Sequence, residues 1–183
     1  MIPQRNISLL ANRLAGRDGR RTPEAVIERD YCLAWLLSSL AQVDLHRKLA
    51  FKGGTALKRC YFGHYRFSED LHFTLVETAT LDEILSGLEA VYARVREASG
   101  IEFRFDRHDR HGHRNSHTFY LTYRGPLPAQ GSVKVDITVR EKIVFPSNGG
   151  RSCAPTTSSP TSLTAVRCES TLLQRSPARK LSR

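Results

Sequence analysis

A glycine turn followed by an acidic strand contains the residues of this chain that could do chemistry. Gly53 and Gly54 lack a Cβ atom, so the backbone there can adopt positive φ angles and bring its N–H groups close to a phosphate. Thr55 can open a short helix over residues 56–62, and the free N–H groups at a helix N-terminus favour an anion. The turn therefore predicts a phosphate-binding loop.

Residues 67–75 follow the turn and alternate apolar and polar side chains, as half-buried strands do. Because successive side chains of a strand point to opposite faces, Asp70 and His72 are predicted to share one face. A phosphate-binding turn joined to an acidic strand indicates nucleotide chemistry.

These motifs resemble those of the AbiEii/AbiGii toxin branch of the polymerase-β-like nucleotidyltransferase superfamily. That family carries a Lys-Gly-Gly-Thr turn, here residues 52–55, and then an Arg-Phe-Ser-x-Asp-x-Asp strand, here residues 66–72. A third carboxylate stands on a later strand, and its position matches Asp136 in the alternating segment 132–139. The resemblance extends over residues 1–145 and implies an α/β (α+β) fold, in which a small mixed sheet flanked by helices carries the site.

The resemblance also implies a function and a set of roles. Such a protein would transfer a nucleotide from an NTP to an acceptor hydroxyl, with RNA as a candidate acceptor. It would be the toxin of a toxin-antitoxin or abortive phage infection system, with a cognate antitoxin as partner. Carboxylates in these enzymes hold divalent metal ions that bridge the triphosphate, so Mg²⁺ or Mn²⁺ is the implied cofactor. Lys52 and Arg66 would screen phosphate charge, and Ser68 could donate a hydrogen bond. The implied catalytic residues are Asp70, Asp136 and Lys52, and the implied nucleotide-binding residues are Gly53, Gly54, Thr55, Arg66 and Ser68.

His72 stands where the family usually has its second metal carboxylate. Magnesium prefers oxygen ligands, whereas an imidazole nitrogen suits Mn²⁺, Co²⁺ or Zn²⁺ better and adds no negative charge. The predicted metal set is Asp70, His72 and Asp136, in which His72 acts as a variant ligand or as a donor that faces phosphate. The alternative is a substituted, inactive site in which His72 only occupies a half-exposed strand.

The elements that must position these residues follow from periodicity. Thr22 and Pro23 are predicted as the N-cap and the first residue of a core-facing helix. Glu28 on that helix could form a salt bridge with Arg29 or Arg66, but a solvated charge is the favoured interpretation. Gly100 is expected to end a later amphipathic helix. The expected helices are 6–15, 24–43, 56–62 and 82–98, and the expected strands are 67–75, 101–105, 118–123 and 132–139.

The segment 107–117 contains four histidines and could hold a metal ion through His111 and His113. No helical spacing or cysteine supports that interpretation, so a polar loop in an antiparallel hairpin is favoured. The four cysteines of the chain show no CxxC spacing and are predicted to be reduced.

Composition limits the class of protein. The chain is 40% hydrophobic and has no long apolar run, so no membrane segment and a cytoplasmic location are expected. Its formal net charge of +10 is compatible with a basic RNA-binding module, an alternative that lacks the sequence signature of an RRM or KH domain.

Residues 147–183 differ from the rest of the chain. Ser and Thr make up 13 of these 37 residues, and six basic residues outnumber one acidic residue. This composition predicts a disordered, low-complexity basic tail after a nucleotidyltransferase-like domain of residues 1–146. A frameshift near residue 146 is one hypothesis for its origin, which would make the protein a truncated remnant that binds nucleotide or antitoxin, and an authentic flexible tail is the other.

Overall fold

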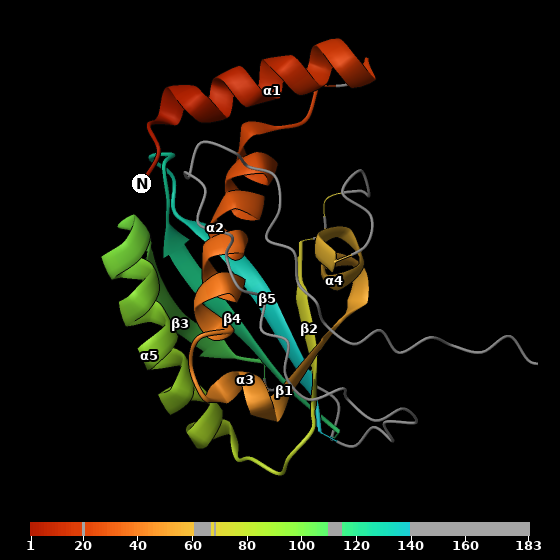
Figure 1. Ribbon diagram of the computed structural model, residues 1–183, viewed down its shortest axis with the longest axis vertical. Helices are drawn as coiled ribbons and strands as arrows, with labels where there is room; N and C mark the ends of the chain where they lie inside the picture. The colour runs from red at the N-terminus through yellow and green to blue at the C-terminus, as the bar shows by residue number, and fades with distance from the viewer. Residues whose placement is uncertain (20, 61–66, 68, 110–114, 140–183) are drawn as a thin grey trace, which may run out of the picture.

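A five-stranded mixed sheet forms the centre of the structure (Figure 1). The computed structural model describes residues 1–19, 21–60, 67, 69–109 and 115–139, with 17, 18 and 57–60 described by their backbone alone. The central pair of strands, β2 and β5, is parallel, and the other pairs are antiparallel. The strands in spatial order are β1 (Leu49–Lys52), β2 (Leu71–Leu75), β5 (Gly131–Thr138), β4 (Ser116–Arg124) and β3 (Glu102–His108).

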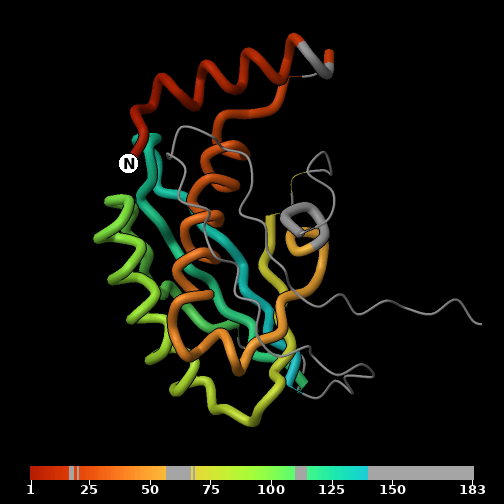
Figure 2. Tube along the Cα trace, viewed as in Figure 1, coloured from red at the N-terminus to blue at the C-terminus, as the bar shows by residue number. Residues whose placement is uncertain are grey.

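Helices flank this sheet, which confirms the predicted α/β fold. Two of them, α2 and α5, cover one face of the sheet, while α4 lies beside β1 and β2, away from α5 (Figure 1). The first helix crosses the N-terminal end of α2 (Figure 2). The helices are α1 (Gln4–Asp18), α2 (Glu24–Leu40), α3 (Leu45–Lys48), α4 (Gly53–Cys60) and α5 (Leu81–Ser99).

The apolar core lies between the sheet and the helices α2 and α5. On β2, Leu71, Phe73 and Leu75 are buried, and the alternate residues of β4 and β5 face the same way. Burying such side chains contributes about 1.5–3 kcal/mol each. Because side chains alternate along a strand, the residues between them point to the opposite face, and His72 and Asp136 are among those.

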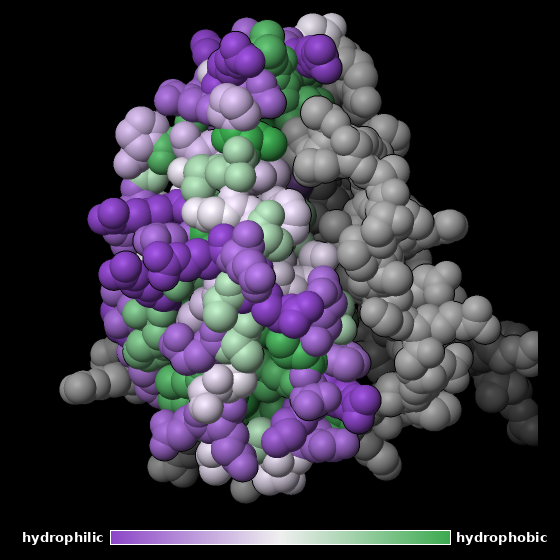
Figure 3. All heavy atoms as spheres, turned by 60° about the vertical axis from the view of Figure 1, so that its left-hand side comes forward, coloured by the Kyte–Doolittle hydropathy of each residue, from purple (hydrophilic) through white to green (hydrophobic). Residues whose placement is uncertain are grey.

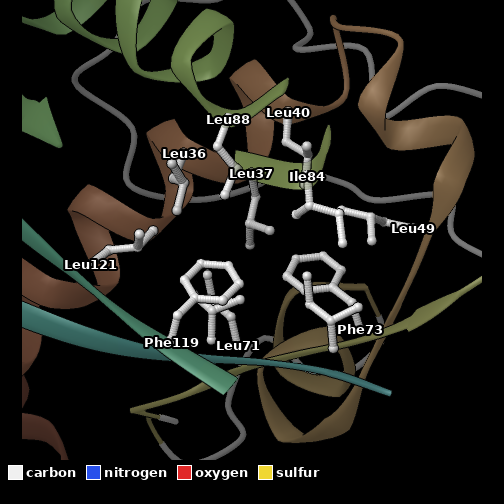
Figure 4. Close-up of a pocket in the computed structure, with 12 residues that line it drawn as sticks. Leu36, Leu37, Leu40, Leu49, Leu71, Phe73, Ile84, Leu88, Phe119 and Leu121 are labelled. Atoms are coloured by element: carbon white, nitrogen blue, oxygen red, sulfur yellow. The ribbon is translucent and has the colours of Figure 1, made fainter. Parts of the chain in front are cut away.

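A cavity of about 20 Å³ lies within this core. Side chains of α2 and α5 meet Phe119, Leu71 and Phe73 of the sheet around it (Figure 4). A space of this size with no polar lining has no groups to hold a water molecule. It is therefore a packing feature of the core and not a ligand site.

The helix α5 shows how local sequence sets an element. Thr80 and Glu83 form a reciprocal capping box at its start, and Gly100 ends it with a φ of 75°, as expected. The side of the molecule that carries α5 shows many hydrophilic residues with hydrophobic residues between them (Figure 3), and the buried apolar residues of the helix face the sheet. Among the described residues, no helix combines the length and the apolar composition needed to cross a membrane.

Several predicted boundaries are wrong. The N-cap of α2 is Pro23 and not Thr22, and the helix ends at Leu40 because the chain turns there into α3. The helix after the glycine turn begins at Gly53, two residues before Thr55. The strand that was expected over 67–75 begins only at Leu71. The antiparallel hairpin of β3 and β4 is confirmed, whereas His111 and His113 lie outside the described residues, as does the predicted tail.

The interpretation of Glu28 as a solvated charge is also wrong. Its side chain is 3% exposed, and its Oε1 accepts a hydrogen bond from the backbone N–H of Leu127 at 2.6 Å. Burial raises the pKa of this carboxyl, and the bond from Leu127 partly offsets that shift. Glu28 therefore ties α2 to the turn between β4 and β5, which precedes the strand of Asp136.

Candidate active site

Four polar side chains form a row across the sheet on the face opposite the apolar core. Lys52 on β1 is the register partner of His72 on β2. His72 in turn pairs with Asp136 on β5, which pairs with Thr118 on β4. Because residues in register on neighbouring strands point to the same face, segments that are far apart in sequence meet in one row.

His72 and Asp136 are the central pair of this row. Nδ1 of His72 lies 3.8 Å from Oδ2 of Asp136, and the two side chains are 37% and 29% exposed. The other carboxylate oxygen, Oδ1, accepts a hydrogen bond from the Thr118 hydroxyl at 2.8 Å. The carboxylate is thus held on one side by Thr118, while its other oxygen faces the imidazole, and both side chains of this pair are partly exposed.

Lys52 places a positive charge at the end of the row. Its Nζ donates a hydrogen bond to Oγ1 of Thr138 at 2.8 Å, one row further along β5. The glycine turn begins at the next residue. An ammonium group in this position can attract a phosphate that approaches the turn, and the role of Lys52 in charge screening stays a prediction.

Position 53 requires a glycine for two reasons: its backbone conformation, and the His72 side chain that an added Cβ atom would meet. Its φ is 82°, a conformation that L-residues with side chains rarely adopt. A Cβ atom at this position would lie 3.0 Å from Cδ2 of the imidazole. The sequence linked this glycine to phosphate alone, because nothing local indicated that a histidine on the next strand packs against it.

Replacing Gly53 by alanine is expected to weaken NTP binding about tenfold. The added Cβ would force either the turn or the His72 ring to move, and a strain of 1–2 kcal/mol corresponds to about one order of magnitude. Calorimetric titration with NTP and Mn²⁺ measures the affinity. Gly16→Ala is the matched control, because its Cβ would meet no atom within 4 Å. Equal affinities in the parent and a folded Gly53→Ala variant would remove the turn from the site.

Thr55 holds the segment that contains Asp70. Its hydroxyl donates to the backbone carbonyl of Asp70 at 2.7 Å, and the residue is 2% exposed. Glu69, the preceding residue, pairs through Oε2 with Nη1 of Arg29 on α2 at 3.0 Å. The prediction that Thr55 opens the helix is therefore wrong. Thr55 is the third residue of α4, and its hydroxyl ties this helix to the segment just before β2. Its hydroxyl is engaged, so any phosphate contact falls to its backbone N–H.

Within the described residues, the protein supplies too few donors to surround a divalent cation, so water or substrate phosphates would complete its coordination. No three His, Cys, Asp or Glu side chains of the described residues stand close enough together for a metal ion, and Asp70 precedes β2. Mg²⁺, however, is commonly bound through one or two carboxylates plus substrate phosphates. Oδ2 of Asp136 and Nδ1 of His72 supply one oxygen and one nitrogen, and the nitrogen suits a transition metal better than Mg²⁺. Arg66 and Ser68 lie outside the described residues.

One comparison with known proteins bears on this site. The family model described as nucleotidyl transferase AbiEii toxin, type IV TA system, matches residues 35–172. The matched stretch includes the row of Lys52, His72, Asp136 and Thr118 together with Gly53. No match is found among the curated proteins.

Proposed function

From the premise that this chain belongs to the AbiEii family of nucleotidyl transferase toxins of type IV toxin-antitoxin systems, we propose that it transfers a nucleotide from an NTP to an acceptor hydroxyl, with RNA as the acceptor. The family implies a nucleotide substrate and a cognate antitoxin. The observation that carries the proposal is the alignment of Lys52, His72 and Asp136 on one face beside the turn at Gly53.

Each residue of the row has a proposed task. Asp136 and His72 would hold Mg²⁺ or Mn²⁺ jointly with the triphosphate, and Asp70, which precedes β2, is the further candidate carboxylate. When bound, the cation supplies positive charge that stabilises the charge developing on the phosphate oxygens. Lys52 neutralises a further part of the phosphate charge. The first N–H groups of α4, at Gly53 and Gly54, face the phosphate and orient it.

A labelling assay tests the proposal. The purified full chain is incubated with each of the four α-³²P-labelled NTPs, total RNA and either Mg²⁺ or Mn²⁺, and the products are separated by size. Label on RNA that depends on both the protein and the cation supports the transfer. If only protein is labelled, the acceptor is a protein and not RNA. If no NTP gives any label, the proposed transferase activity is refuted.

A catalytically silent protein that binds nucleotide or antitoxin is the second candidate. The observation that favours it is His72, since an imidazole in the row removes one negative charge from the pair that would face the cation. Such a protein would bind NTP in calorimetry and leave every acceptor unlabelled. The two candidates therefore differ in turnover and not in nucleotide affinity.

A further inference from the structure

The buried hydroxyl of Thr118 holds the Asp136 carboxylate from the side that faces away from His72. Thr118 on β4 lies in register with Asp136 on β5, and its Oγ1 donates to Oδ1 at 2.8 Å. Oδ2 of the same carboxylate faces Nδ1 of His72. The two oxygens of one carboxylate therefore have different partners, one on each neighbouring strand.

Exposure separates Thr118 from the residues that a ligand can reach. Thr118 is 5% exposed, whereas the side chains of His72 and Asp136 remain partly accessible. A cation or phosphate that reaches this face can contact His72 and Asp136 but not the Thr118 hydroxyl. Valine would fill the same β-branched position in a strand, so the packing does not require the hydroxyl. Any effect of this group on the site must act through Asp136.

We propose that Thr118 is a positioning residue, whose hydroxyl holds Oδ1 of Asp136 so that Oδ2 is left to receive the divalent cation beside His72. The inference rests on the proposed function, because it concerns the same site. A hydrogen bond to one oxygen limits rotation of the carboxylate about its Cβ–Cγ bond. Contacts of this kind behind a metal ligand contribute about 10- to 100-fold in metal affinity or activity.

The test compares Thr118→Val with Thr118→Ser and with Thr122→Val in the full chain. Valine removes the hydroxyl, and serine keeps it. Thr122 is a control four residues along the same strand and on the same face, where it pairs with Ser132. Mn²⁺ alone is titrated into each variant, and the free ion is followed by electron paramagnetic resonance. We expect Thr118→Val to bind Mn²⁺ about 10-fold or more weakly, and Thr118→Ser and Thr122→Val to bind it like the parent.

The outcomes distinguish a role of Thr118 in positioning Asp136 from a purely structural role. A purely structural Thr118 would lower the melting temperature without changing the Mn²⁺ affinity of the folded protein, and that result would overturn the inference while the proposed function stands. An equal loss in Thr122→Val would also overturn it. If Thr118→Val does not fold, Thr118→Ala serves the same comparison. A parent that neither binds Mn²⁺ nor labels RNA would refute the proposed function, and the role of Thr118 with it.

Discussion

Replacing Asp136 by asparagine is expected to lower nucleotide transfer by at least about 10³-fold while the fold is kept. Asparagine has nearly the same shape, and its carbonyl oxygen can still accept the hydrogen bond that Thr118 donates. The loss would therefore report the missing negative charge beside His72 and not a rearranged sheet. Initial rates with labelled NTP measure the transfer, and circular dichroism gives the melting temperature, which should stay close to that of the parent.

Asp70→Asn extends this experiment to the second carboxylate. If Asp70 and Asp136 serve one site, each single variant should lose transfer, and the double variant should be little worse than either, because residues that act as a unit are strongly non-additive. Transfer retained in both single variants would rule out the nucleotidyltransferase site. Independent, multiplicative losses would instead place Asp70 outside the group formed by Asp136 and its neighbours.

The alternation of apolar and polar residues was sufficient to predict most of the sheet. It predicts that Asp136 and the residues beside it on the strand point to opposite faces, and the structure confirms this with Val135 and Ile137 buried. It also predicts that the carboxylates of Asp70 and Asp136 lie on a single sheet face only if their strands are neighbours. The direct parallel pairing of β2 with β5 meets that condition. These features are local or depend on a single strand pairing. The alternation of residues in the sequence is therefore enough to predict them.

The contacts that complete the site are not local and leave no pattern in the sequence. A Cβ atom at position 53 would meet the His72 ring, and the Thr118 hydroxyl reaches Asp136 from another strand. Glu28 occupies an otherwise ordinary helical position, yet the β4–β5 turn buries it by supplying the N–H of Leu127. Each of these depends on which elements pack together, so a residue type and its spacing along the chain could not indicate them.

The choice of cation should depend on His72. His72→Asp is expected to shift the ratio of activity with Mg²⁺ to activity with Mn²⁺ upward by about tenfold or more, because it replaces a nitrogen donor by an oxygen donor and restores a negative charge. Without metal, the new carboxylate would face Asp136, whose Oδ2 now lies 3.8 Å from Nδ1 of the imidazole. Repulsion between the two carboxylates should lower the melting temperature of the metal-free variant.

Added Mg²⁺ should reverse that loss, because a cation bound only by the folded state stabilises it in proportion to the logarithm of its concentration. His72→Asn is the matched control, since it removes the imidazole and its contact with Gly53 without adding charge. It should show neither the gain in Mg²⁺-supported activity nor the melting temperature that depends on Mg²⁺. If His72→Asp and the parent have identical metal profiles, His72 lies outside the coordination shell. If His72→Asn gives the same shift as His72→Asp, the effect comes from the lost imidazole and not from the restored carboxylate.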